Sequence, residues 1–279
     1  MIRGFGCCNE LYEPRPIVEG FRALREAGYD AVEVAPYTFG DPVFPRALQM
    51  APEVRRAAEA MGLRVLGLHW LFARTQRLHI HHPDAAVRRA TRDYLLRLMD
   101  LCCALGGDIM VFGSPPARGL LPGQSPTDAF ARTRDFFADV MSDAAARGVA
   151  LCFEPLARQT TTFIRTAAEA LALMRAVGHA HFRLNLDTIA LSDEARPPAE
   201  TLRQVWREAP DAVRHIQVND PNLLGPGMGD LDFAPIREAL DEVGYDGWVS
   251  VEAFDFSVGP DRIARESLAY LRRIWARGV

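Results

Sequence analysis

Lysine is absent from this sequence of 279 residues, so all 32 of its basic side chains are arginine. A chain without lysine cannot use Schiff-base catalysis by lysine or the phosphate-binding loop that requires one. The formal net charge is −4 and no basic block occurs, so nucleic-acid binding has no electrostatic support. Membrane-length apolar runs and a signal-peptide pattern are missing too, which predicts a cytoplasmic protein without a membrane partner.

Cysteine is scarce, and its spacing excludes a common class of metal site. The five cysteines contain no C-x-x-C pair, and four of them are adjacent in sequence: Cys7, Cys8, Cys102, Cys103 and Cys152. We therefore expect neither a zinc framework nor ordinary disulfides, but small buried residues. Cys7 and Cys8 end the first expected strand, where a side chain can meet a ligand.

The sequence does contain a regular alternation of short apolar runs and longer helical patterns. Strands are expected at 2–8, 30–36, 63–69, 108–114, 149–155, 182–187, 213–220 and 247–254. Helices are expected at 16–27, 46–61, 84–105, 126–147, 166–177, 198–208, 232–243 and 260–276, most of them followed by glycine. Eight such units predict an α/β fold, a single (β/α)8 TIM barrel domain over residues 1–279. The alternative, an open doubly wound sheet, lacks a G-x-G-x-x-G after the first strand.

Polar residues recur at the expected ends of these strands. Alternate residues of a barrel strand face the interior, and the other set faces the helices. In "LCFE", Leu151 and Phe153 suit the apolar helix layer, so Glu154 faces inward. The same reasoning gives an inward polar residue on six strands: Glu33, His69, Glu154, Asp187, Gln217 and Glu252. These residues lie at the end of the barrel where sites are built.

Several carboxylates at one end of a barrel need a positive partner, because burying them uncompensated costs too much free energy. With no lysine available, a divalent cation is the simplest partner. Glu154, Asp187, Glu252 and the amide oxygen of Gln217 would form an all-oxygen ligand set. Such hard ligands favour one Mn²⁺ or Mg²⁺, with Zn²⁺ or Co²⁺ as alternatives. The competing interpretation is that each carboxylate pairs with one of the arginines.

Four segments, "CFEPL", "LNLDT", "HIQVND" through "PGMGDLDF" and "YDGWVSVEAF", resemble the xylose-isomerase-like TIM barrels. This family includes isomerases and epimerases of sugar phosphates and keto sugars, and the resemblance is strongest from 149 to 254. It implies a divalent metal held by Glu154, Asp187, Gln217 and Glu252. The usual third ligand is a histidine, and the "HIQ" at 215–217 is similar to the hydroxypyruvate isomerase branch.

Three positions depart from the D-tagatose and D-psicose 3-epimerases of that family. Those enzymes carry a histidine after the Asp ligand, a second glutamate after the first Glu ligand, and an arginine after the strand 7 ligand. Here the corresponding positions are Ala190, Thr160 and Leu223. The resemblance therefore implies a different small-molecule substrate: a keto sugar, a sugar phosphate or a hydroxy-keto acid.

The expected reaction is proton transfer beside a carbonyl group. A bound metal polarises the carbonyl and acidifies the neighbouring C–H. Glu154 and Glu252, on opposite faces of the substrate, would remove and return the proton through a cis-enediolate. The side chains expected to contact substrate are His69, Arg118, Arg158, Glu33, Trp70, Ser114 and Asp220.

Other functions stay open at this point. A metal-dependent dehydratase of a keto-inositol or dehydroshikimate would begin with the same proton abstraction, and a non-catalytic barrel subunit would keep the fold alone. An endonuclease of the same fold would need further histidine ligands and a basic groove.

Two tryptophans expected to be exposed, Trp206 and Trp248, suggest a homodimer or homotetramer. The histidines of "HIHHP", residues 79–83, are expected to be solvated.

Overall fold

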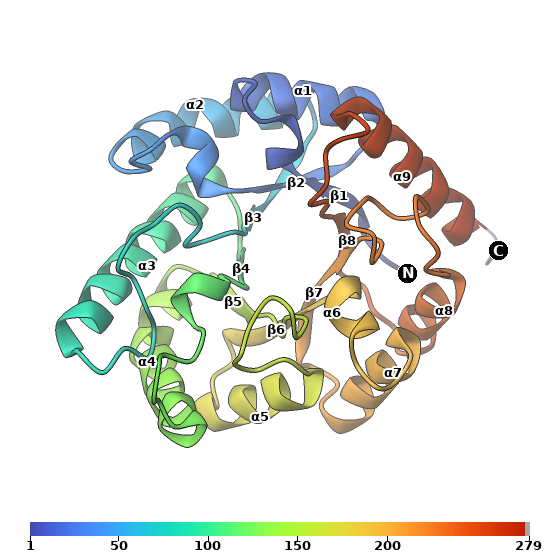
Figure 1. Cartoon of the computed structure of the whole chain (residues 1–279). Coiled ribbons are helices and arrows are strands. Elements are labelled where there is room, and N and C mark those ends of the chain that lie inside the picture. The colour runs from blue at the N-terminus through green and yellow to red at the C-terminus, as the bar shows by residue number, and fades with distance from the viewer. Residues whose placement is uncertain (277–279) are drawn as a thin grey trace.

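Eight parallel strands close into a barrel in the computed structural model, which describes residues 1–276. Figure 1 shows them in chain order around the barrel axis. They are β1 (Gly4–Cys8), β2 (Ala31–Val34), β3 (Arg64–Leu68), β4 (Ile109–Phe112), β5 (Ala150–Phe153), β6 (Phe182–Asp187), β7 (Val213–Val218) and β8 (Trp248–Val251). Pairing of β1 with β8 closes the barrel. The predicted (β/α)8 TIM barrel is therefore confirmed.

Helices form a ring outside the strands (Figure 1). They are α1 (Ile17–Ala27), α2 (Arg46–Ala60), α3 (Ala85–Leu105), α4 (Pro126–Ala146), α5 (Ala167–Val177), α7 (Pro198–Glu208), α8 (Ala234–Glu242) and α9 (Pro260–Ala276). Their ends lie within two residues of the predicted ones. The short helix α6 (Thr188–Ser192), which directly follows β6, was not predicted. None of the helices in residues 1–276 combines the length and apolarity that crossing a membrane requires.

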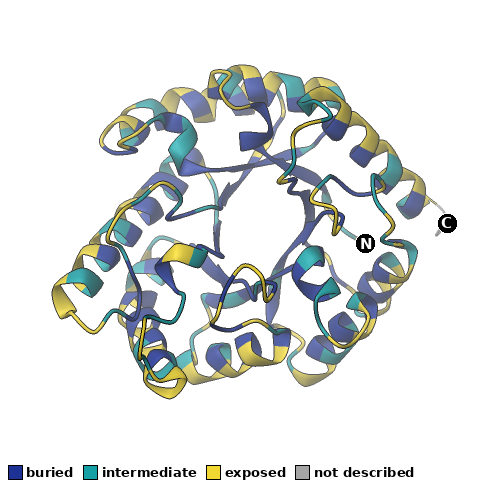
Figure 2. Ribbon diagram, viewed as in Figure 1, coloured by how far each residue is buried: buried dark blue, intermediate teal, exposed yellow. Residues whose placement is uncertain are grey.

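The main core lies between the barrel and the helices. Figure 2 shows buried residues along the strands and on the helix faces that meet them, with exposed residues on the outer helix surfaces. Phe153 on β5 stacks on Phe112 of β4, and both rings meet Phe137 of α4 edge-on, with ring centroids 5.1–5.7 Å apart. This aromatic packing fixes β5 on its outer side, immediately before Glu154.

The interior of the barrel changes character along its axis. Near the N-terminal ends of β4 and β5 it is filled by a small apolar cluster of Ile109, Val111, Ala150 and Cys152. Toward the C-terminal ends the inward residues become polar, and they remain buried. The apolar cluster thus lies below a polar chamber at the C-terminal ends of the strands, where (β/α)8 barrels build their sites.

One tryptophan is not where the sequence suggested. Trp206 is buried and packs against Tyr245, with ring centroids 5.8 Å apart. The expectation that it is exposed for self-association was therefore wrong. Trp248 is partly exposed, and a homodimer or homotetramer stays a prediction.

Candidate active site

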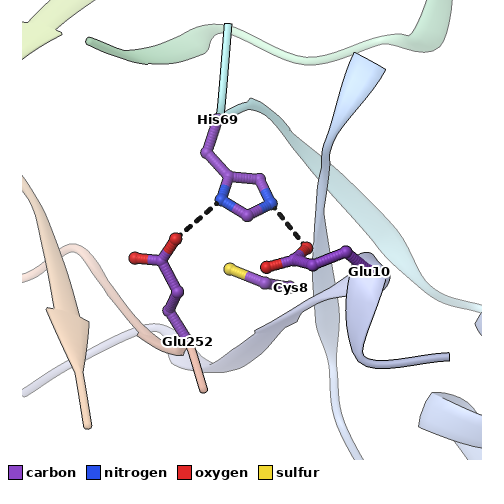
Figure 3. Close-up of side chains that lie close together, drawn as sticks. All are labelled: Cys8, Glu10, His69 and Glu252. Carbon is purple, nitrogen blue, oxygen red and sulfur yellow. Dashed lines mark hydrogen bonds and ion pairs between the residues drawn. The ribbon is translucent and has the colours of Figure 1, made fainter. Parts of the chain in front are cut away.

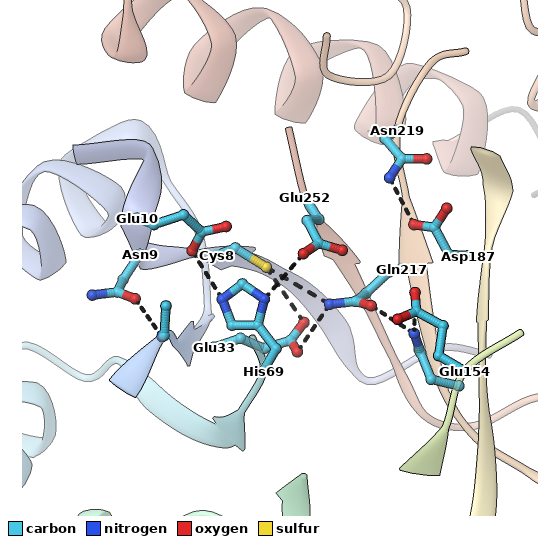
Figure 4. Close-up of polar contacts among 12 residues, drawn as sticks. Cys8, Asn9, Glu10, Glu33, His69, Glu154, Asp187, Gln217, Asn219 and Glu252 are labelled. Atoms are coloured by element: carbon cyan, nitrogen blue, oxygen red, sulfur yellow. Dashed lines mark hydrogen bonds and ion pairs between the residues drawn. The ribbon is translucent and has the colours of Figure 1, made fainter. Parts of the chain in front are cut away.

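All six polar residues predicted to face the barrel interior are buried. Their exposed fractions are 6% or less: Glu33, His69, Glu154, Asp187, Gln217 and Glu252. Figure 4 shows them converging from different strands on one chamber. The strand register places side chains of adjacent strands at the same height along the barrel axis, since Asp187 pairs with Gln217 and Glu33 pairs with Cys8. The alternation in the sequence therefore placed these side chains correctly.

Three carboxylates form the centre of this chamber. Glu154, Asp187 and Glu252 each offer an oxygen that lies within 4.8 Å of the others. Burial and the charge of Glu252 raise the pKa of Asp187 to about 7. Burial, Glu252 and Asp187 together raise the pKa of Glu154 well above its usual range, and burial raises that of Glu252. Burial and mutual repulsion of the three carboxylates therefore favour binding of protons or of a cation among them.

Asp187 is held in place by the start of α6. Its Oδ1 accepts hydrogen bonds from the backbone N–H groups of Ile189 at 2.8 Å and Ala190 at 3.3 Å, capping the helix. Its Oδ2 accepts from Asn219 at 2.6 Å. A carboxylate with several fixed donors keeps one orientation, so Asp187 is preorganised before any ligand binds.

Glu154 and Glu252 are supported by different neighbours. Asn185 donates to Glu154 at 3.2 Å. Gly113 approaches the same carboxylate so closely that a Cβ there would collide with it. On the other side, Glu252 Oε1 lies 3.1 Å from His69 Nδ1. The two glutamates thus reach the chamber from β5 and β8, on separate parts of the barrel wall.

Gln217 lies beside the carboxylates, in the centre of Figure 4. Its amide oxygen accepts from Asn185 at 2.6 Å, and its Nε2 donates to Glu33 at 3.2 Å. Asn185 therefore bridges Gln217 and Glu154. To ligate a cation, the amide oxygen of Gln217 would exchange the N–H of Asn185 for the ion, and its role as a ligand stays a prediction.

Glu33 belongs to a buried ion pair below the chamber. His215 Nε2 lies 2.8 Å from Glu33 Oε1, and both side chains are almost fully buried. Burial alone would raise the pKa of Glu33, but His215 outweighs it and lowers that pKa to about 2. Glu33 does not line the cavity, so its place favours support of the chamber floor over substrate contact.

The carboxylate trio fits a divalent cation. Within residues 1–276, the only ion pair formed by any of the three is that of Glu252 with His69. The competing interpretation, in which each carboxylate pairs with an arginine, therefore finds no support in these contacts. Three buried oxygens on one centre are hard ligands that suit Mg²⁺ or Mn²⁺.

A cavity of about 370 Å³ opens above the trio. His69, Trp70, Ser114, Glu154, Asp187 and Glu252 are in its lining, together with apolar side chains such as Leu156, Ile189 and Phe254. Trp70 and Phe254 meet edge to face, with centroids 6.1 Å apart, and form part of the wall. The volume suits a small molecule held over the carboxylates.

The three departures from the ketose 3-epimerase pattern all lie in this wall. Thr160, Ala190 and Leu223 line the cavity. Where three charged or imidazole groups could grip sugar hydroxyls, this protein has one hydroxyl and two apolar side chains. Of these three positions only Thr160 can form a side-chain hydrogen bond, and the neighbouring Gln159 is a further polar side chain of the lining.

Like Glu33, three further predicted substrate contacts lie outside the cavity lining: Arg118, Arg158 and Asp220. The guanidinium of Arg118 is fully buried and donates to the carbonyls of Glu154, Phe163 and Ile164. Arg118 therefore holds the loop after β5, which the sequence could not indicate. Arg158 is exposed beside Asp193.

Asp220, the third of these residues, orders the loop after β7. It is buried and accepts from the backbone N–H groups of Gly227 at 2.9 Å and Leu231 at 3.0 Å. These contacts use both of its carboxylate oxygens within the loop. Asp220 therefore has a positioning role in this structure.

Two of the three histidines of "HIHHP" are not solvated as expected, whereas His82 is partly exposed. His79 and His81 are buried, and their Nε2 atoms contact the carbonyls of Gly119 at 2.9 Å and Arg118 at 2.7 Å. Burial lowers the pKa of His79 to about 4, so it is neutral at pH 7. The two residues join the loop after β3 to the loop after β4, which corrects the prediction.

One residue of the chamber was missed by sequence reasoning. Glu10 lies in a short turn, Asn9–Tyr12, immediately after β1, and its Oε2 is 2.8 Å from His69 Nε2. Burial alone would lower the pKa of His69, but Glu10 and Glu252 raise it well above the usual value. Strand alternation cannot place a residue beyond the end of the strand, so no sequence signal pointed to Glu10.

Comparison with known proteins places this fold among sugar-converting enzymes. The family described as xylose isomerase-like TIM barrel matches residues 21–274. A ketose 3-epimerase of Arthrobacter globiformis is 25% identical over 281 residues, which cover 97% of this chain and 90% of the relative. A 3-dehydro-D-guloside 4-epimerase of Escherichia coli K12 is 25% identical over 282 residues, covering 96% and 98%.

The fold itself is shared with solved structures. The crystal structure of D-psicose 3-epimerase in the presence of D-fructose matches with a TM-score of 0.84, over 97% of this chain and 99% of the other. Its sequence identity of 22% is low, so the likeness concerns the arrangement of strands and helices alone.

Proposed function

The chain belongs to the xylose isomerase-like TIM barrel family, and we propose that it is a divalent-metal-dependent epimerase of a small keto sugar. One observation carries the proposal: the buried trio Glu154, Asp187 and Glu252 at the base of a cavity of about 370 Å³. Curated relatives that span most of the chain are named as sugar epimerases. Their names agree with what this site could do chemically.

Glu154, Asp187 and Glu252 would hold the ion, with Gln217 as the predicted fourth ligand. When bound, a divalent cation in this position lowers the pKa of the C–H next to a carbonyl group and neutralises the developing charge. Asp187 is the ligand best fixed in advance, because α6 and Asn219 hold both of its oxygens. We favour Mn²⁺ or Mg²⁺ because the donors are oxygens.

Glu154 and Glu252 would carry the proton. They enter the chamber from β5 and β8, so a substrate lying between them presents opposite faces to the two carboxyl groups. One glutamate removes the proton from the carbon next to the carbonyl, and the other returns a proton to the opposite face, through an enediolate. Burial raises the pKa of both carboxyl groups in the metal-free protein, and a bound cation would lower it again, so that each glutamate is a carboxylate able to accept the proton.

The cavity wall bears on the choice of substrate. Ala190 and Leu223 are apolar, and Thr160 supplies a single hydroxyl. A free ketose has hydroxyl groups along its whole length, and those facing this wall would lose their hydrogen bonds to water. We therefore propose a keto sugar with a less polar substituent at that end, such as a glycoside. The relative named 3-dehydro-D-guloside 4-epimerase has a glycoside substrate in its name.

Exchange of carbon-bound hydrogen with solvent tests this function. The Mn²⁺-loaded protein is incubated in D₂O with free ketoses and with 3-keto-glycosides, and products are followed by mass spectrometry and NMR. We expect one deuterium at the epimerised carbon, and we expect Glu154→Gln and Glu252→Gln each to lower the rate by about 10²–10⁴-fold. Glu59→Gln is the control, because Glu59 is exposed on α2. Loss of water without an epimer would instead identify a dehydratase, and the epimerase proposal would be wrong.

A further inference from the structure

A second group of potential metal ligands lies on the other side of Glu252. Cys8, Glu10, His69 and Glu252 each offer one ligand atom, and these atoms lie within 4.8 Å of one another. All four residues are at least 95% buried. Figure 3 shows the sulfur of Cys8 between the two carboxylates, with the imidazole of His69 contacting both of them.

Two of these atoms lack a hydrogen-bond partner. Glu10 Oε2 and His69 Nε2 approach to 2.8 Å, but the approach lies outside hydrogen-bonding geometry. Within residues 1–276 neither buried atom has another hydrogen-bond partner. Each of the two atoms therefore has only the other as a polar contact in this part of the chain, and a bound cation would replace this ion pair with a metal–ligand bond to each.

The spacing suits a small cation. Bonds of about 2.0–2.3 Å to nitrogen, oxygen and sulfur put neighbouring ligands of a tetrahedral ion about 3.3–3.8 Å apart. Glu10 and His69 are 2.8 Å apart, and all four ligand atoms lie within 4.8 Å of one another, so the group is compact enough for such an ion. Shifts of less than about 1 Å would close the group around an ion.

The surrounding contacts resemble the support that metal ligands usually have. A metal-bound histidine commonly donates its other ring N–H to a carboxylate. His69 Nδ1 lies 3.1 Å from Glu252 Oε1, so Glu252 can fill this role while Nε2 faces Glu10. The turn that carries Glu10 is fixed by Asn9, which accepts from the N–H of Ala35 at 2.8 Å.

We propose that Cys8, Glu10 and His69 Nε2 form a second metal site, which Glu252 joins to the carboxylate trio. Its donors are one sulfur, one nitrogen and one oxygen, which favour Zn²⁺ or Co²⁺ over Mg²⁺. Binding replaces the proton on Nε2 and releases the thiol proton of Cys8 to solvent. The site lies beyond the proposed function, because the epimerase mechanism assigns no step to Cys8, Glu10 or His69.

Cobalt binding provides a test that does not depend on activity. The whole protein is stripped with a chelator and titrated with Co²⁺, while bound metal and the near-ultraviolet thiolate-to-cobalt charge-transfer band are recorded. We expect two equivalents per chain and a band in the native protein. Cys8→Ser should lose the band and one equivalent. Cys7→Ser is the matched control, because Cys7 is equally buried but outside the group, and it should keep both.

Two further variants separate this site from the other. Glu10→Gln should weaken the equivalent that gives the band by at least about tenfold, since a neutral amide replaces a charged ligand. Asp187→Asn should lose an equivalent and keep the band, because Asp187 belongs only to the trio. A native protein without the band, or a Cys8→Ser variant that still binds two equivalents, would overturn the proposal. In that case Glu10, His69 and Glu252 form only an ion-paired chain. An Asp187→Asn variant that keeps both equivalents would count against the proposed function alone.

Discussion

Asp187→Asn should be more stable than the native protein without metal, and Mn²⁺ should remove most or all of that difference. In the metal-free protein the pKa of this carboxyl rises from 3.8 to about 7, chiefly through burial and the charge of Glu252. A group whose pKa is raised on folding contributes its stability below its unfolded pKa, and that contribution is lost as the pH rises through the folded value. As the pH rises from about 4 to about 8, the unfolding free energy of the metal-free native protein should therefore fall, while that of Asp187→Asn should not fall for this reason.

The magnitude follows from the pKa and the local contacts. A rise from 3.8 to about 7 corresponds to about 4 kcal/mol of unfolding free energy, at about 1.4 kcal/mol for each tenfold change in proton affinity. In Asp187→Asn, an amide N–H group takes the place of the carboxylate oxygen that accepts a hydrogen bond from Asn219. Loss of this hydrogen bond lowers the unfolding free energy by about 1–3 kcal/mol. At pH 8 the metal-free variant should thus be more stable by about 1–3 kcal/mol. With Mn²⁺ at about 100 times its dissociation constant, the native protein gains about 2.7 kcal/mol that the variant does not.

Urea unfolding at pH 8, with a chelator and with Mn²⁺, measures both differences. Asp135→Asn is the control, because Asp135 is exposed and pairs with Arg134 outside the chamber; it should match the native protein in both conditions. If Asp187→Asn is no more stable than the native protein in chelator, the carboxylates do not repel one another as described. If Mn²⁺ stabilises both proteins equally, Asp187 is not a ligand.

Three further results should follow. Gly113→Ala should lower epimerase activity at least about tenfold and the unfolding free energy by about 1–3 kcal/mol, because the added Cβ would collide with the Glu154 carboxylate. If activity and urea unfolding match those of the native protein, the close approach of Gly113 to Glu154 is wrong. Glu33→Gln should lower the unfolding free energy by about 1–3 kcal/mol, since an amide replaces the carboxylate that contacts both His215 and Gln217, and denaturation near pH 7 measures this. The affinity for Mn²⁺ should fall at least about tenfold per pH unit below about pH 7, where Asp187 binds a proton in competition with the ion and the raised pKa values of Glu154 and Glu252 add to the effect; calorimetric titration showing a pH-independent affinity would argue against this.

The barrel and its inward residues could be predicted because strand geometry leaves few choices. Side chains alternate with a period of two, and the apolar helix layer decides which set faces outward. Leu184 and Leu186 had to face the helices, so Asp187 had to face the chamber, and it does. The same logic placed Glu154 and Glu252 at the ends of β5 and β8.

Contacts made by loops could not be predicted in the same way. Arg118 is an arginine in a loop by sequence, and only the folded chain brings three carbonyl oxygens around its guanidinium and the Phe153 ring 4.6 Å beneath it. His79 and His81 are likewise buried by a loop from another part of the chain. Glu10 reaches the chamber from a turn whose position depends on Asn9. These placements depend on tertiary contacts that no local periodicity encodes.

The most direct test of the account is a crystal structure of the protein with Mn²⁺, using anomalous diffraction to locate the ion. The account predicts an anomalous peak about 2.0–2.4 Å from an oxygen of each of Glu154, Asp187 and Glu252. A map without a peak among these three carboxylates, at Mn²⁺ concentrations that saturate the protein in solution, would contradict it.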